Sequence, residues 1–319
     1  MPIVKKIEYD HPKWQFNGHL QTIIPSVFRQ AFRLPFDRER VNTPDGDFLD
    51  LDWLRNQSSK LVIISHGLEG NSRRPYMTGM ARQFFSNGYD VLNWNYRGCG
   101  EELNRKPIFY HSGATYDLDF VINHAEASYK EIYLIGFSLG GNLTLKYLGE
   151  SRSRTEKIKK GVAVSAPLHL ESSSVKISTG ENIIYAKRFL RTLKEKVVQK
   201  AKIFPNDIPV GILRKIKTLQ DFDDHFTGPL HGFENAHDYY EKNSSLYFLD
   251  GIEVPCLILN AQNDPFLSEK CFPVSIGRRL ENVWMEFPKY GGHVGFSPRK
   301  KEDIYWSEHR AFEFITRDQ

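Results

Sequence analysis

The chain of 319 residues has few cysteines and no long apolar run, and both absences restrict its class. Its three cysteines, Cys99, Cys256 and Cys271, show no metal-ligand spacing and form no even set for a disulfide framework. We expect Cys256, which follows a proline inside an apolar run, to be a small buried core residue. No stretch reaches the roughly 18 to 20 apolar residues that cross a bilayer, and residues 1–13 lack the apolar region of a signal peptide. These absences predict a soluble, cytoplasmic protein.

The sequence also lacks a concentration of one charge. Its 43 basic and 39 acidic residues are interleaved and give a formal net charge of +4. Because nucleic-acid-binding proteins usually gather basic charge on one face or arm, we expect no nucleic-acid partner. The most basic stretch, residues 187–202, carries an apolar pattern too, and we interpret it as a helix with a solvated face. Peripheral contact with a membrane through this helix is the alternative.

Strand-like apolar segments alternate with segments of helical period along much of the chain. Residues 48–54 alternate apolar and acidic side chains, and the turn signal before them predicts a hairpin with the residues near Arg40. Further strands are expected at residues 61–64, 90–94, 131–135, 161–165, 256–260 and 283–287, and helices at 74–86, 115–128, 139–149 and 302–315. Such alternation implies crossover connections, so we predict an α/β fold with a mostly parallel central sheet flanked by helices.

This alternation stops between residues 168 and 249, where the sequence predicts several helices and no clear strand. A helical block that interrupts an α/β pattern is typical of an inserted cap. We therefore expect a core of residues 1–167 and 251–319 with a helical cap insertion at 168–250, although the length alone would equally allow two domains. The first forty residues have no clear period apart from a helix-compatible run that ends near Phe32.

The sharpest motif is the pentapeptide from Gly136 to Gly140, which reads Gly-Phe-Ser-Leu-Gly. It stands directly between an apolar strand and a helix, the context in which Gly-x-Ser-x-Gly exposes a serine nucleophile on a strained turn. Side chains near that turn would clash, and Gly136 and Gly140 relieve the clash. The motif therefore makes Ser138 the candidate nucleophile. A plain strand-to-helix turn that uses glycine for packing is the alternative.

A serine hydroxyl is a poor nucleophile at neutral pH and needs a base and an orienting acid. In the α/β-hydrolase fold the acid follows a late strand and the histidine follows the last one. Asp264 and His293 occupy these places, and His293 stands between glycines in a loop. The alternatives are weaker: Asp250 precedes its strand, Asn263 carries no charge, and His309 falls within the closing helix.

Two backbone N–H groups are required to stabilise the oxyanion that forms during acyl transfer. Leu139, directly after the candidate nucleophile, supplies one. The loop after the strand at residues 61–64 supplies the other, for which we choose Leu68, with Gly67 allowing the turn. His66 could be mistaken for a second base, but we expect it to pack beneath the site and to hydrogen-bond this loop.

Taken together, these segments resemble the YheT-like branch of the α/β hydrolases, esterases related to the mammalian ABHD1/2/3 group. The matching segments cover nearly the whole chain and are Asn17-Gly18-His19-Leu20-Gln21-Thr22, His66-Gly67-Leu68-Glu69-Gly70, Tyr96-Arg97-Gly98-Cys99, His111-Ser112-Gly113, Gly136-Phe137-Ser138-Leu139-Gly140-Gly141-Asn142, Phe222-Asp223-Asp224, His231-Gly232-Phe233, Asp264-Pro265-Phe266 and Gly291-Gly292-His293-Val294-Gly295-Phe296. The resemblance implies a charge-relay triad at Ser138, Asp264 and His293. Where relatives often carry two adjacent aspartates, this chain has Asn263 before Asp264, which leaves one acid available. Asp117 could bond into the network of loop-shaping motifs.

The expected function is hydrolysis of carboxylic esters, of short to medium acyl chain or lipid-like, through an acyl-enzyme. This chemistry needs no metal and no organic cofactor. A thioesterase or an amidase would use the same triad, and a non-catalytic ligand-binding protein is the alternative from another class. The Phe, Tyr and Leu content of residues 168–249 suggests an apolar substrate group, although those side chains could equally form the core of the cap. A lipid ester rests on analogy with the mammalian relatives alone.

Overall fold

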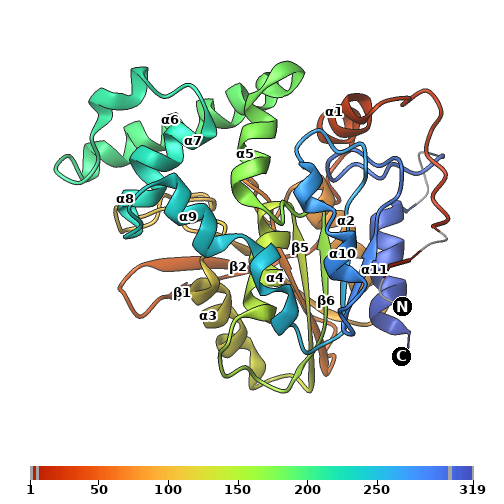
Figure 1. Ribbon diagram of the computed structural model, residues 1–319. Helices are drawn as coiled ribbons and strands as arrows, with labels where there is room; N and C mark the ends of the chain where they lie inside the picture. Colours follow the sequence, from red (N-terminus) through yellow and green to blue (C-terminus); the bar gives the residue numbers. More distant parts are fainter. Residues whose placement is uncertain (1–2, 5–6, 301–303, 318–319) are drawn as a thin grey trace.

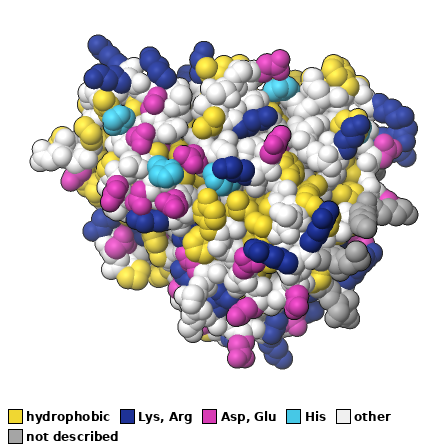
Figure 2. Space-filling view, in the orientation of Figure 1, with side chains coloured by type: hydrophobic (Ala, Val, Ile, Leu, Met, Phe, Trp, Pro, Cys, Tyr) yellow, Lys and Arg dark blue, Asp and Glu magenta, His cyan; other side chains and the backbone are white. Residues whose placement is uncertain are grey.

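The computed structural model describes residues 3–4, 7–300 and 304–317. A central sheet is covered by helices on both faces, and a group of helices, α5 to α9, lies together beyond one end of it (Figure 1). Basic and acidic side chains are intermixed over the visible face (Figure 2). None of the helices in the described part of the chain combines the length and apolar character that a bilayer span needs.

Within the described residues, the sheet has eight strands in the order β1-β2-β4-β3-β5-β6-β7-β8. Their bounds are β1 Asp37–Asn42, β2 Phe48–Leu54, β3 Lys60–Ser65, β4 Asp90–Asn95, β5 Glu131–Phe137, β6 Ile158–Val164, β7 Cys256–Leu259 and β8 Val283–Glu286. The β1–β2 and β2–β4 pairs are antiparallel and all the other pairs are parallel. The predicted hairpin near Arg40 and the mostly parallel sheet are thus both confirmed.

Strand β3 illustrates why the parallel part of the sheet is built from continuous apolar runs. Leu61 and Ile63 join the core on one face, while Val62 and Ile64 join the core on the other. Because both faces are covered, every residue of this strand after Lys60 is buried. Helices α3 (Thr115–Glu126), α4 (Leu139–Gly149) and α10 (Val274–Gly277) contribute to the first core, and α2 (Pro75–Phe85) and α11 (Trp306–Thr316) contribute to the second.

Between β6 and β7, every element in the segment expected to form the cap is helical. The elements are α5 Leu170–Ser178, η1 Gly180–Asn182, α6 Ile183–Ile203, η2 Val210–Arg214, α7 Leu219–Phe222, η3 Asp223–Thr227, α8 Gly228–Leu230, α9 Ala236–Asn243 and η4 Ser245–Gly251. The element η3 is a π-helical turn and the other η elements are 3-10 helices. A separate apolar cluster of buried side chains, which includes Leu190, Val197 and Phe226, fills the interior of this group.

Three sequence expectations need correction or completion. Helix α1 spans Gly18–Phe28, so it ends before Phe32. The closing helix was expected from residue 302, which lies outside the described residues, and α11 begins at Trp306. The prediction of a solvated face for residues 187–202 is wrong at Lys200, whose side chain is fully buried. Its ammonium donates to the carbonyl oxygens of Lys106 and Ile108, and these hydrogen bonds replace its contacts with water. Cys256 is a buried core residue, as expected.

Candidate active site

Ser138 sits on the sharp turn between β5 and α4. Its backbone has φ 52° and ψ −119°, a left-handed conformation that is strained for a residue with a side chain. The glycines of the motif make this turn possible at close quarters. A Cβ on Gly136 would collide with the carbonyl of Gly140, and a Cβ on Gly140 would collide with the carbonyl oxygens at the end of β3. The turn therefore requires glycine on both sides of the serine.

The three residues expected to form a relay are brought together from three separate segments. The Nε2 atom of His293 lies 2.9 Å from the Oγ atom of Ser138, and its Nδ1 atom lies 2.8 Å from the Oδ2 atom of Asp264. The Asp264 side chain is fully buried, and its Oδ1 accepts a hydrogen bond from the backbone N–H of Phe266. The Phe266 ring stacks on the imidazole at a centroid distance of 4.0 Å. These contacts fix the histidine ring in one plane between the serine and the carboxylate.

Two of the three rejected alternatives lie away from this relay. Asp250 is exposed and pairs with Arg279 at the surface, and His309 is exposed on α11. Asn263 lies beside the relay, but its side-chain amide is used by the loop. Its Nδ2 donates to Gln21, and its Oδ1 accepts from the backbone N–H of Gly292. Its position next to Asp264 therefore shapes the loop and supplies no charge.

An N-terminal segment that sequence reasoning left without a role holds the loop of the base. Gln21 is buried, and its Oε1 accepts from Asn263 and from the backbone N–H of Gly291. The hydroxyl of Thr22 accepts the backbone N–H of His293 at 2.9 Å. The only available signal was the match of residues 17–22 to the YheT-like pattern, because contacts across some 270 positions leave no local period.

The two expected oxyanion donors are free to bind a ligand. In the loop after β3, the N–H groups of Gly67, Glu69 and Gly70 are bonded to Tyr76, Tyr110 and a loop carbonyl. Among the described residues, the N–H of Leu68 has no hydrogen-bond partner. Leu139 begins α4, where the first N–H groups of a helix have no partner within the helix. One loop and one helix start thus each present a donor beside Ser138.

His66 contacts this loop through its ring nitrogens. Its ring is buried, its Nε2 accepts from the backbone N–H of Tyr96, and its Nδ1 therefore donates to the carbonyl oxygen of Gly67 at 2.8 Å. Burial lowers the pKa of His66 to about 3, so the ring is neutral at physiological pH. It is a loop support and is in no position to act as a second base.

The side chain of Glu69 ties the same loop to helix α6. Its Oε1 lies 2.7 Å from the ammonium of Lys196, and the hydroxyl of Tyr110 donates to the same oxygen at 2.9 Å. The side chain of Glu69 is buried, and the backbone of this residue has a φ of 53°. Since Glu69 directly follows Leu68, this ion pair fixes the residue next to one candidate oxyanion donor.

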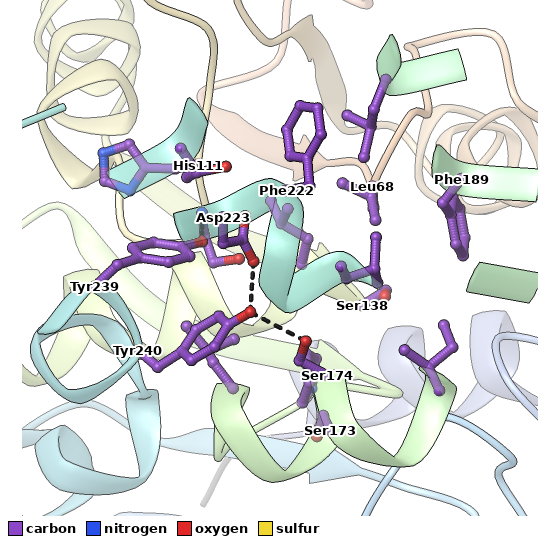
Figure 3. A pocket seen from close by; sticks show the side chains of 18 of the residues that line it. Leu68, His111, Ser138, Ser173, Ser174, Phe189, Phe222, Asp223, Tyr239 and Tyr240 are labelled. Carbon is purple, nitrogen blue, oxygen red and sulfur yellow. Dashed lines mark hydrogen bonds between the residues drawn. The ribbon is translucent and has the colours of Figure 1, made fainter. Parts of the chain in front are cut away.

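Two cavities meet at the candidate nucleophile. Both are lined by a common set of side chains: Leu68, Ser138, Phe189, Phe266 and His293. The first cavity, of about 130 Å³, extends among helices α5, α6, α7 and α9 and the π-helical turn η3 (Figure 3). The second, of about 180 Å³, extends toward α1 and includes Arg29, Arg74 and Arg188 in its wall. A substrate held at Ser138 can therefore extend in two directions.

No cluster of three or more His, Cys, Asp or Glu side chains in the described residues is arranged to hold a metal ion. A sequence model of the α/β-hydrolase fold matches residues 60–291 of the chain. The chain belongs to the α/β-hydrolase family.

Relatives confirm the YheT-like branch. The candidate esterase YheT of Escherichia coli is 33% identical over 290 residues, which cover 88% of this chain and 84% of that protein. Phospholipase ABHD3 of Homo sapiens is 27% identical and covers 92% and 75% of the two chains. The monoacylglycerol lipase of Saccharomyces cerevisiae is 30% identical, with coverage of 83% and 60%. The chain is thus a hydrolase-family protein with esterase and lipase relatives.

Solved structures share the fold. Esterase Pf2001 of Pyrococcus furiosus superposes with a TM-score of 0.58 at 17% identity and covers 90% of this chain and 96% of its own. Est1E of Butyrivibrio proteoclasticus, solved with ferulic acid, gives a TM-score of 0.58 at 16% identity, with coverage of 87% and 97%. At these identities the likeness establishes the architecture alone.

Proposed function

We propose that the protein is a serine esterase that cleaves carboxylic esters through an acyl-enzyme. The observation that carries the proposal is the hydrogen-bond chain from Ser138 through His293 to the buried Asp264, with both links below 3 Å. We assign the two oxyanion donors to Leu68, which lines both cavities together with this serine, and to Leu139, which directly follows it. A nucleophile, a base, an orienting acid and an oxyanion site are the four parts that acyl transfer requires.

In this mechanism His293 accepts the hydroxyl proton of Ser138 at Nε2 while Oγ attacks the ester carbonyl carbon. The negative charge that develops on the carbonyl oxygen is bound by the N–H groups of Leu68 and Leu139. Collapse of this tetrahedral intermediate breaks the bond to the alcohol, which leaves with the proton from His293. A water molecule, deprotonated by the same imidazole, then attacks the acyl-enzyme and releases the acid. Asp264 holds the tautomer and stabilises the imidazolium.

The substrate we propose is a small-molecule or lipid-like ester that occupies both cavities. The two cavities diverge from Ser138, so one would take the acyl chain and the other the alcohol. The helices of residues 168–250 would act as a cap over this site. The lipase and phospholipase names of relatives support an ester with a fatty acyl chain.

The test compares the wild type with Ser138→Ala on short and medium p-nitrophenyl esters. We expect the variant to lose at least about 1,000-fold in kcat, because the nucleophile of a triad is indispensable. His309→Ala is the matched control, since this histidine is exposed on α11. Fluorophosphonate treatment followed by mass spectrometry should place the adduct on Ser138. Unchanged turnover in the variant, or labelling at another residue, contradicts the proposal.

A panel of matched esters, thioesters and anilides decides between an esterase and the related reactions. The oxyanion site and relay are common to all three, so the preference has to come from the leaving group. We expect the ester to have the highest kcat/KM. A thioester or an amide that exceeds it would change the reaction class and leave the residue assignments in place.

A further inference from the structure

The wall of the first cavity contains a polar cluster that the mechanism does not use. Asp223, on the π-helical turn η3, accepts a hydrogen bond from the hydroxyl of Tyr240 at 2.6 Å, and the Tyr240 oxygen lies 3.0 Å from the hydroxyl of Ser174 (Figure 3). Most of the surrounding wall is apolar, with Leu170, Ile177 and other large side chains. We call Asp223, Tyr240 and Ser174 the Asp223 cluster.

The Asp223 cluster lies on the side of Ser138 that faces away from the second cavity. Its three residues line the first cavity and are absent from the wall of the second, whereas Ser138 and His293 line both. In Figure 3, Asp223 and Tyr240 lie on the side of the cavity opposite to Phe189. A substrate bound at the serine would therefore point one of its ends toward the cluster.

The carboxylate has hydrogen-bonding capacity left for a ligand. A carboxylate offers about four acceptor positions, and Asp223 receives side-chain hydrogen bonds from Tyr240 and Thr227. Tyr240 has a single proton, so when it donates to Asp223, the hydroxyl of Ser174 donates to Tyr240 in turn. Asp223 is the member of the cluster that remains partly accessible, while Tyr240 and Ser174 are buried.

A purely structural reading explains the cluster less well. The three residues do join α5, η3 and α9, but an apolar contact would join them without placing a carboxylate in an apolar wall. Among the described residues, Asp223 has no Lys or Arg partner. Burial raises its pKa to about 6, so at neutral pH it is largely ionised and an acceptor. Such a group can accept a charge-assisted hydrogen bond from a neutral donor that enters the cavity.

We propose that the Asp223 cluster binds a hydroxyl group of the ester substrate, at a position remote from the ester bond. This inference rests on the proposed function, since it assigns a substrate class to the same site. A carboxylate on the substrate would be repelled by Asp223. An ammonium would have to leave water for an apolar cavity, which is costly. The neighbouring Asp224 would not help to bind it, because its carboxylate accepts a hydrogen bond from the backbone N–H of Ala236. A hydroxyl donates one hydrogen bond at little desolvation cost.

The hydroxyl can belong to the acyl chain or to the alcohol, and two substrate series distinguish these sources. The first compares p-nitrophenyl esters of straight-chain acids of six to twelve carbons with their terminal-hydroxyl counterparts. The second series compares hexanoate esters of simple alcohols with hexanoate esters of the matching diols. The rate of acid release is the quantity measured. In one series we expect kcat/KM to rise by about tenfold or more for the hydroxylated member at one chain length, the size of a hydrogen bond to a charged group.

Variants then assign the preference to the cluster. In Asp223→Asn and in Tyr240→Phe we expect the hydroxyl preference, the ratio of kcat/KM for the hydroxylated ester to that for the plain ester, to fall to about threefold or less. Asp224→Asn is the matched control, because this neighbouring aspartate does not line the cavity, and it should keep the preference. The wild-type comparison decides the main point even if a variant does not fold.

The outcomes separate this inference from the proposed function. Plain esters hydrolysed in a Ser138-dependent manner, with no hydroxyl preference in either series, overturn the inference alone. A preference that survives in both Asp223→Asn and Tyr240→Phe overturns it as well, as does a stronger preference for terminal-amino substrates. Failure of the wild type to turn over any ester overturns the proposed function first.

Discussion

Lys196 is expected to act on the reaction through the oxyanion loop, and Lys196→Met tests this. The substitution keeps most of the length and apolar stem of the lysine but removes the ammonium that lies 2.7 Å from Glu69 Oε1. Glu69 is then left buried with one side-chain donor, the hydroxyl of Tyr110. The carboxylate of Glu69 then carries a buried charge without a cation, and movement of the loop toward water would relieve this. Leu68, the residue before Glu69, would move with the loop.

The magnitude follows from the contacts that remain. Complete loss of one oxyanion donor costs about 100- to 1,000-fold in kcat. Because Tyr110 still holds both the backbone N–H and the side chain of Glu69, we expect a partial displacement and a fall in kcat of about tenfold. KM should change by less than about twofold, since the donor acts on the transition state more than on the bound ester. Breaking the buried pair should also lower the free energy of unfolding by about 2–4 kcal/mol.

The assay is steady-state hydrolysis of a p-nitrophenyl ester, with unfolding by urea measured in parallel. Lys196→Arg should restore most of the kcat, because it returns the positive charge. Lys194→Met is the matched control: this lysine lies on the same helix and donates to the carbonyl oxygen of Ile216, away from the oxyanion loop. The reasoning is refuted if Lys196→Met loses stability at unchanged kcat, or if Lys194→Met lowers kcat to the same degree.

Three further predictions follow from other parts of the structure. Gly140→Ala should yield little folded protein by circular dichroism, because its methyl group would meet backbone carbonyls at the end of β3; a soluble variant with normal melting temperature would contradict this. Arg97→Met should cost about 3–5 kcal/mol in urea unfolding, because it leaves the buried carboxylates of Asp117 and Asp47 without their shared cation; a loss below about 1 kcal/mol would count against it. Burial raises the pKa of Asp223 from 3.8 to about 6, so between these pH values the folded state binds more protons than the unfolded state, and stability falls as pH rises. The wild type should lose up to about 3 kcal/mol relative to Asp223→Asn from pH 4 to pH 7, and a difference that is constant with pH would reject the assignment.

The relay could be predicted from the sequence because each of its members depends on local context. Ser138 stands in a turn whose glycines are required by its own backbone, and the positions of Asp264 and His293 after late strands follow from the way in which parallel strands end at one edge. The same applies to Leu68 and Leu139, each of which is placed by the strand or helix next to it. Local propensity and strand order thus carry enough information to predict where these five residues lie, while their roles stay a proposal.

The supports of the site could not be predicted in this way. Gln21 reaches the loop of the base across 270 positions, and Lys196 reaches Glu69 across 127. Neither contact leaves a period or a spacing in the sequence. The burial of Lys200 could not be predicted from the sequence either, because a lysine in a basic helix is expected to be solvated. It is buried because its ammonium donates to carbonyl oxygens of a loop that is distant in the sequence.

The origin of each support has a consequence for how the site responds to change. Ser138 is held by β5 and α4, which belong to the main core, so changes at the nucleophile turn affect folding and rate together. His293 and Leu68 lie on loops that are held by side chains of α1 and α6, outside the sheet. Substitution of those side chains should therefore alter the alignment of the base or of an oxyanion donor without changing the nucleophile turn itself. We therefore expect substitutions in α1 and α6 to change the rate of the reaction and the substrate preference. The nucleophile turn would stay intact in such variants.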